Sequence, residues 1–228
     1  MQQGKRLFLF ILLFVFSFSS FAEKKKKPNY KKIEKEIKKK KSDLYYPKLW
    51  EKFMDADPNM TLEEKRHLYY GYIFQTDYSA YGRAEYSDSL RSLMKIDNPS
   101  DSILNQIVII GDSVLKEQAF DVRARNYQLY ALDKLGNTIE YEKKLTQMKI
   151  IIQAIMSSGD GLTKKTAFYV FSVPHEYFIL SVLGYDFGGS QSLIEHYDYL
   201  VVENNKEGIK GFYFDISPSL NSLSDIFK

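Results

Sequence analysis

The spacing of apolar residues changes once along this chain, close to residues 157–161, and this change restricts the folds open to it. From Pro28 to about residue 157, apolar residues recur at the three- and four-residue spacing of amphipathic helices. After Gly161, aromatic and β-branched residues are dense, as is typical of strands. We therefore expect an α+β fold, with α-helical hairpins over 42–158 and a small C-terminal antiparallel β module over 159–228.

Helix signals in the first part are local and specific. The predicted helices cover residues 29–40, 44–55, 61–75 and 83–95, a segment that opens at Asn98-Pro99, and residues 120–135 and 139–156. Thr61 and Glu64 have the spacing of a capping box, and Gly136 suits a left-handed helix end. Gly71 lies among large residues, as where paired helices approach closely. The short helices resemble a tetratricopeptide-like array over one or two hairpins, although no repeat period near 34 residues is present.

The C-terminal part combines strand and helix signals. The predicted elements are a strand over 166–173, a helix over 175–183, a hairpin of strands over 197–203 and 209–216, and a helical turn over 219–227. Pro174 should stop the first strand and Gly184 should cap the helix, although the apolar density of 175–183 also permits a strand. Residues 188–192 are interpreted as a flexible loop because they combine glycine and serine.

The N-terminus has the pattern of a secretory signal peptide. Lys5 and Arg6 precede the apolar run Leu7–Phe18, and small residues stand at positions −3 and −1 of a cleavage site after Ala22. The run is shorter than the roughly 20 residues of a bilayer span. The chain contains no cysteine, which excludes disulfides, thiolate metal sites and a lipoprotein anchor. We expect a soluble periplasmic or secreted protein.

Charge is distributed unevenly after the predicted cleavage site. Residues 23–41 hold 11 lysines, whereas residues 42–228 carry 19 basic and 26 acidic residues. The basic segment Lys24–Lys41 is either a contact for membrane or cell wall or a solvated tail leading into a lysine-rich helix. An exported protein with an acidic body is not expected to bind nucleic acid.

Catalytic signals are sparse. His175-Glu176 resembles the start of a zinc-hydrolase motif, but Ile179 occupies the position of the second histidine ligand. A loose metal site could use His175, His196, Asp198 and Asp215, all in the C-terminal part. The weak catalytic candidates are these four residues and Glu176. The alternative is that they are ordinary polar residues at the ends of elements. No nucleophile elbow, phosphate-binding loop or dinucleotide fingerprint occurs, and we expect no metal and no cofactor.

Tyrosine provides a clearer signal for binding. Six of the 18 tyrosines fall within Tyr69–Tyr86, interleaved with polar residues. Rigid aromatic faces beside hydrogen-bonding groups suit stacking on sugars or holding a peptide, and the alternative is packing between helices. If the cluster binds a ligand, Tyr78, Tyr81 and Arg83 are the expected binding residues, because loops present side chains outward.

Several strings along the mature chain resemble one family of exported proteins of Bacteroidetes-type bacteria, the domain-of-unknown-function family numbered 4919. They are Tyr45-Tyr46-Pro47, Met60-Thr61-Leu62-Glu63-Glu64, Tyr78-Ser79-Ala80-Tyr81-Gly82-Arg83, Gly159-Asp160-Gly161, His175-Glu176-Tyr177, His196-Tyr197-Asp198-Tyr199 and Phe212-Tyr213-Phe214-Asp215. The resemblance implies a location in the cell envelope and assigns no activity or catalytic residue.

Together these observations favour a non-enzymatic module that binds another envelope protein or a peptide. Two alternatives remain open: an envelope hydrolase acting on glycan or peptide through the weak candidates above, and a carbohydrate-binding protein that uses Tyr69–Tyr86.

Overall fold

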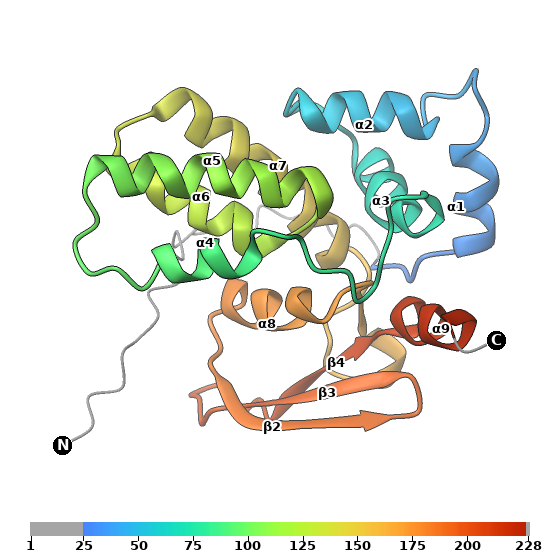
Figure 1. Cartoon of the computed structure of the whole chain (residues 1–228). Helices are drawn as coiled ribbons and strands as arrows, with labels where there is room; N and C mark the ends of the chain where they lie inside the picture. The colour runs from blue at the N-terminus through green and yellow to red at the C-terminus, as the bar shows by residue number, and fades with distance from the viewer. Residues whose placement is uncertain (1–24, 227–228) are drawn as a thin grey trace.

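The structure is a computed structural model that describes residues 25–226, and the signal peptide predicted for 1–22 lies outside the described residues. The described chain has the expected α+β fold, with nine α-helices and one four-stranded sheet (Figure 1). The first helices are α1 (Tyr30–Ile37), α2 (Tyr46–Met54), α3 (Leu62–Gly71), α4 (Ser87–Leu93), α5 (Asp101–Glu117), α6 (Val122–Lys134) and α7 (Thr138–Met156). The later elements are β1 (Phe168–Tyr169), α8 (Val173–Val182), β2 (Phe187–Ile194), β3 (Tyr197–Val202), β4 (Gly211–Asp215) and α9 (Ser217–Ile226), with two short 3-10 turns at Tyr72–Phe74 and Lys164–Thr166.

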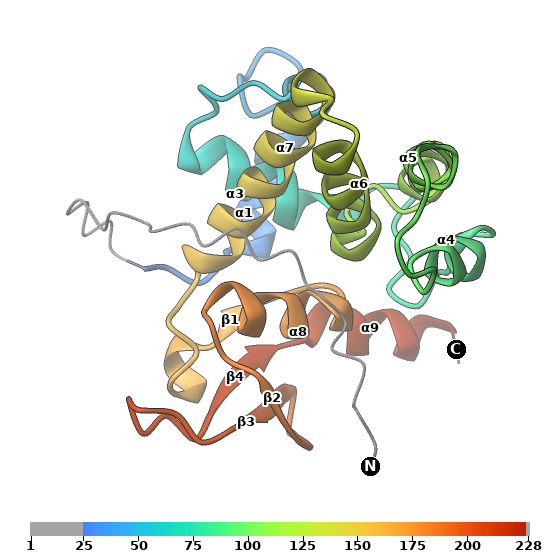
Figure 2. The same cartoon turned by 90° about the vertical axis from the view of Figure 1, so that its left-hand side faces the viewer.

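The helices and the sheet form separate layers. Helices α1–α7 lie on one side, the sheet lies on the other, and α8 runs between them (Figures 1 and 2). The main hydrophobic core extends from α1, α2, α3 and α7 through α8 to the sheet. A smaller core lies among α4, α5 and α6, around Leu104 and Ile107. The molecule therefore has a seam where the two cores meet.

Local sequence signals explain most helix ends. The capping box of α3 is present: the Glu64 amide donates to the Thr61 hydroxyl, and the Glu64 carboxylate accepts from the Thr61 amide. The predicted left-handed caps are also confirmed, since Gly136 and Gly184 have φ values of 69° and 83°. At these positions a side chain would strain the backbone. One predicted helix start was wrong: Asn98-Pro99 lies outside α5, which begins at Asp101 with Ser100 as its N-cap.

The lysine-rich N-terminal segment packs on the body from residue 25 onward. The Lys26 amide donates to the Ser157 carbonyl, and Ile33 and Ile37 of α1 are buried against the main core. At Gly71 of α3, an added Cβ would lie 3.2 Å from the Ile37 side chain and 3.3 Å from that of Tyr46. This confirms the close helix approach expected there. The lysines of α1 point into solvent while its isoleucines hold it in place.

The sheet has the strand order β1-β4-β3-β2, and the predicted hairpin corresponds to β3 and β4. The pairs β2–β3 and β3–β4 are antiparallel, whereas β1 pairs with β4 in parallel, so the sheet is mixed. The strand predicted over 166–173 is correct only at Phe168–Tyr169. Pro174 lies in the first turn of α8, where its missing N–H costs nothing, so the proline starts a helix and does not merely end a strand.

The loop predicted over 188–192 is wrong, because these residues belong to β2. This strand lies at the sheet edge and is exposed on both faces, so it lacks the alternation of apolar and polar residues that marks a half-buried strand. Its pairing shifts between Phe187 and Gln191, where Gly189 adopts φ = 82°. Hydrogen bonds to the backbone of β3 hold this strand in place, and burial of its side chains contributes little to its stability.

Candidate functional site

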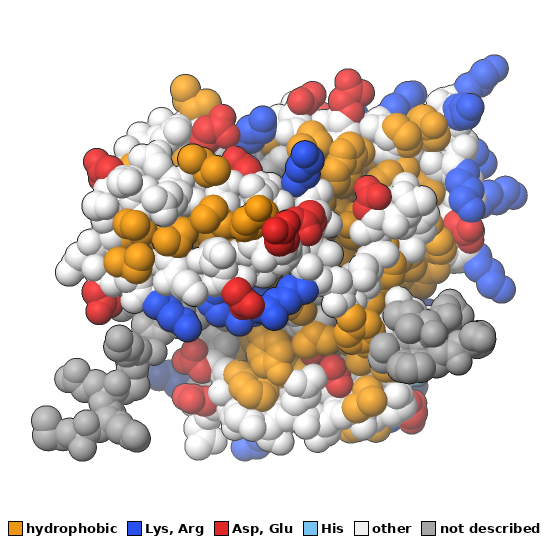
Figure 3. Space-filling model, viewed as in Figure 1, with side chains coloured by type: hydrophobic (Ala, Val, Ile, Leu, Met, Phe, Trp, Pro, Cys, Tyr) orange, Lys and Arg blue, Asp and Glu red, His pale blue; other side chains and the backbone are white. Residues whose placement is uncertain are grey.

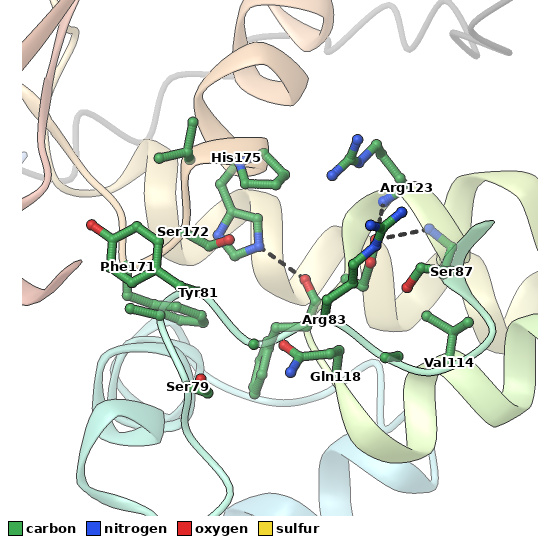
Figure 4. A pocket seen from close by; sticks show the side chains of 18 of the residues that line it. Ser79, Tyr81, Arg83, Ser87, Val114, Gln118, Arg123, Phe171, Ser172 and His175 are labelled. Carbon is green, nitrogen blue, oxygen red and sulfur yellow. Dashed lines mark hydrogen bonds between the residues drawn. The ribbon is translucent and has the colours of Figure 1, made fainter. Parts of the chain in front are cut away.

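A cavity of about 310 Å³ opens at the seam between the two cores. Its walls are the loop over 78–84 with the adjoining α4, the α5–α6 junction, and the segment over 171–175 that enters α8 (Figure 4). We call it the arginine cleft, because Arg83, Arg91 and Arg123 all line it. Its size is at the lower end of small-ligand sites.

The three binding residues expected from the tyrosine-rich segment all line the arginine cleft. Tyr81 is 50% exposed, so half of its surface is open to solvent. Tyr78 is more enclosed: its hydroxyl donates to the Phe171 carbonyl at 3.2 Å, and burial raises its pKa to about 12. Tyr78 therefore forms a wall, whereas Tyr81 and Arg83 are the accessible groups.

The remaining tyrosines of this segment divide between core and surface. Tyr69, Tyr70 and Tyr72 are buried in the main core. Tyr69 and Tyr72 pack with Phe120 and Phe171, and Tyr70 packs edge-on against Tyr69. Tyr86 is exposed and does not line the cleft. Aromatic packing thus accounts for these three tyrosines, and Tyr78 also packs on Tyr72 and Phe171.

The charges at the cleft are mainly positive. Asp88 forms ion pairs with both Arg83 and Arg91, so these two arginines are partly neutralised. The Arg123 guanidinium makes no ion pair or hydrogen bond within residues 25–226. Figure 3 shows a band of basic side chains across this face with an acidic side chain within it.

Among the described residues that line the cleft, Asp121 carries the carboxylate, and this group is already engaged. Asp121 is the N-cap of α6 and accepts from the amides of Arg123 and Ala124, at 2.8 and 2.9 Å. Ser172, the N-cap of α8, makes no side-chain capping hydrogen bond. The α8 N-terminus therefore adds its partial positive charge to the wall of the cleft.

The five catalytic candidates do not converge. His175 lies deep in the main core, where its Nε2–H donates to the Phe120 carbonyl at 2.9 Å and its Nδ1 accepts from Tyr69. Burial lowers its pKa to about 4. At the turn after β2, His196 lies 3.5 Å from Asp215, whose carboxylate accepts from the amide and hydroxyl of Ser217.

Glu176 and Asp198 form the second pair of candidates that interact with each other. Glu176 is fully buried on α8, and neither of its carboxyl oxygens has a hydrogen-bond partner within the described chain. Burial, and then the negative charge of Asp198 on β3, raises the pKa of Glu176 to about 9. Asp198 accepts from Gln191 at 2.7 Å. Neither carboxyl lines the arginine cleft, so the pair has no cavity in which to meet a substrate there.

Arg91 and Arg123 were missed by the sequence reasoning. They lie on α4 and α6, separated from each other by 32 positions, and neither belongs to a motif. Their only signal is that they are basic residues in an acidic body. The fold places both arginines at the cavity that is also lined by Tyr78 and Tyr81.

Comparison with known proteins identifies one family. The model of the family described as a domain of unknown function, DUF4919, matches residues 31–225. No curated protein and no solved structure matches the chain. Within residues 25–226, no helix combines the length and apolar character needed to cross a membrane.

Proposed function

The chain belongs to the DUF4919 family, and we propose that it is a non-enzymatic binding protein whose arginine cleft receives an acidic peptide segment of a partner. One observation carries this proposal: three arginines from separate parts of the chain line one cavity beside the exposed ring of Tyr81. Arginine binds carboxylates in a two-pronged geometry, and tyrosine and arginine are enriched among residues that dominate binding energy.

The charge pattern argues for an acidic ligand. The body over 42–228 has seven more acidic than basic residues, yet the basic side chains outnumber the acidic ones in the cleft. A neutral or basic segment would leave the Arg123 guanidinium without a counter-charge. A carboxylate side chain or a chain-terminal carboxylate would supply one.

A peptide is favoured over the alternatives considered from the sequence. Three tyrosines of the cluster are occupied in the core, so a sugar-stacking platform would have to rest on Tyr81 with little aromatic support. Hydrolysis would need groups that act together at a cavity, and the five candidates divide into the pair His196–Asp215, the pair Glu176–Asp198, and His175 by itself. The signal-peptide pattern of residues 1–22 supports a partner in the periplasm or outside the cell. Contact of Lys24–Lys41 with a membrane or cell wall stays a prediction.

Fluorescence anisotropy with two labelled peptides tests the proposal directly. One peptide carries four glutamates, and the other carries glutamines at the same positions. We expect saturable binding of the glutamate peptide, at least tenfold weaker binding of the glutamine peptide, and weakening with salt because surface charges are screened. Equal binding of both peptides, or no binding of either, would contradict the proposal.

A matched pair of variants locates the site. Arg123→Gln removes the guanidinium that has no partner within residues 25–226 and should weaken binding of the glutamate peptide about tenfold or more, as expected for a hydrogen bond to a charged group. Lys143→Gln makes the same charge change at an exposed position of α7 away from the cleft, and should bind like the wild type. If both variants lose affinity equally, the binding reflects net charge and not the cleft.

A further inference from the structure

A histidine and two glutamates meet where α1 packs on α3, and none of the three lines the arginine cleft. Glu36 comes from α1, while Glu63 and His67 lie one turn apart on α3. One ligand-type atom from each residue lies within 4.8 Å of the other two. An imidazole with two carboxylates is a donor set that proteins use for Zn²⁺ and similar ions.

The imidazole is held in the orientation of a metal ligand. His67 is only 5% exposed, and its Nδ1 lies 2.8 Å from the Glu63 carbonyl oxygen. Because a carbonyl only accepts, Nδ1 carries the proton, as in histidine ligands that are fixed by a backbone carbonyl. Nε2 then points to the Glu36 carboxylate, 2.8 Å away. Nε2 is therefore the ring nitrogen available as a metal donor, and an ion would bind by replacing this contact between Nε2 and the Glu36 carboxylate.

Beside the contact between Glu36 and His67, Lys32 is the basic side chain that faces both carboxylates, and it is loosely held. Lys32 lies 3.7 Å from Glu36 and 3.9 Å from Glu63, beyond hydrogen-bonding distance, and its side chain is 55% exposed. Exposed ion pairs of this kind contribute little free energy. A bound dication can therefore displace the lysine without disturbing the core.

We propose that His67, Glu36 and Glu63 bind a transition-metal dication of the Zn²⁺ class, with water in the remaining position. Hard ions such as Mg²⁺ and Ca²⁺ prefer oxygen-only sites, so the imidazole selects against them. The ion would cross-link α1 to α3. Since Ile33 and Ile37 are the buried residues of the eight-residue α1, this link would strengthen the attachment of the lysine-rich helix.

Calorimetric titration of the metal-stripped mature chain with Zn²⁺ tests the site, with a Mg²⁺ titration beside it. We expect one Zn²⁺ per chain, no Mg²⁺ binding at the same concentrations, and a rise in Tm when Zn²⁺ is added, because a ligand of the folded state stabilises it. Absence of saturable Zn²⁺ binding would refute the proposal.

Variants separate this site from adventitious binding. Glu63→Gln alters a side chain that is 61% exposed, so the fold should persist, and Zn²⁺ affinity should fall at least tenfold. Lys32→Met should raise the affinity, because it removes the competing cation. His196→Gln is the matched control, since His196 also lies beside a carboxylate, and it should leave the titration unchanged. Loss of binding in His196→Gln, or unaltered binding in Glu63→Gln, would place the ion elsewhere and overturn the proposal.

Discussion

The hydroxyl of Tyr69 donates to Nδ1 of His175 across 2.7 Å, and this bond joins α3 to α8 at the centre of the main core. The opposite ring nitrogen of His175 donates to the Phe120 carbonyl. Both polar ends of a buried neutral imidazole are thereby satisfied, and three distant segments of the chain are linked. The histidine that resembled part of a metal motif thus has both ring nitrogens hydrogen-bonded inside the fold.

Tyr69→Phe should destabilise the protein by about 1–3 kcal/mol, because it leaves the buried Nδ1 of His175 without a donor. Urea unfolding at pH 7 measures this change. Tyr81→Phe is the control: the Tyr81 ring is half exposed, so the loss of its hydroxyl should cost no more than about 0.5 kcal/mol. Equal stabilities of the two variants would contradict the structural role of the Tyr69 bond.

Acidification should destabilise the protein through His175 at pH values where most carboxylates are still ionised. Burial lowers the pKa of His175 from 6.5 to about 4, so the unfolded chain binds more protons between these values. The stabilisation is present above pH 6.5 and is lost as the pH falls toward 4. At about 1.4 kcal/mol for each pKa unit, the loss amounts to about 3 kcal/mol.

The difference in unfolding free energy between wild type and His175→Gln, measured from pH 7 to pH 4.5, isolates this contribution. We expect the difference to shrink as the pH falls, whatever the overall stability of the variant. A pH-independent difference would show that His175 does not titrate in this way.

Glu176→Gln should have the opposite pH dependence. Burial, with Asp198 nearby, raises the pKa of Glu176 from 4.5 to about 9, so the folded state retains a proton that the unfolded chain loses. Wild-type stability from this group is complete below pH 4.5 and is lost as the pH rises toward 9. Relative to that of the wild type, the free energy of unfolding of Glu176→Gln should therefore increase by about 2 kcal/mol or more between pH 5 and pH 9.

Chemical denaturation across this pH range measures the gain. Glu142→Gln, which changes an exposed carboxyl on α7, should follow the wild-type profile. Parallel profiles for Glu176→Gln and the wild type would refute the raised pKa.

Gly159→Ala should prevent normal folding or cost at least about 3 kcal/mol, because its Cβ would lie 2.0 Å from the Thr166 carbonyl oxygen and 2.4 Å from that of Ala167. These are backbone atoms, so no side-chain movement relieves the contact. Gly136→Ala provides the comparison: nothing lies within 4 Å of its added Cβ, and only its positive φ of 69° is strained. It should cost about 1 kcal/mol by thermal unfolding. Similar costs at both positions would contradict the close approach at Gly159.

Sequence reasoning succeeded where the deciding interactions lie within a few residues. The capping box at Thr61 and Glu64, the left-handed Gly136 and the β3–β4 hairpin are all present. It failed at β2, because an exposed edge strand is made by pairing with β3 and has no pattern of its own. It also could not predict that Arg91 and Arg123 lie near the loop that carries Tyr81, because the distance of each arginine from that loop depends on how α4 and α6 pack.

The sequence by itself determined the order and type of most elements, because periodicity, caps and turns act over one or two helical turns. It also marked the loop with Tyr78, Tyr81 and Arg83, which lines the arginine cleft. Tertiary structure alone decided that His175 is buried and held by Tyr69, and that His196 lies with Asp215 and Glu176 with Asp198. These contacts join residues that are far apart in the chain. They form because apolar surface is buried in the two cores, and this burial leaves no local signal in the sequence.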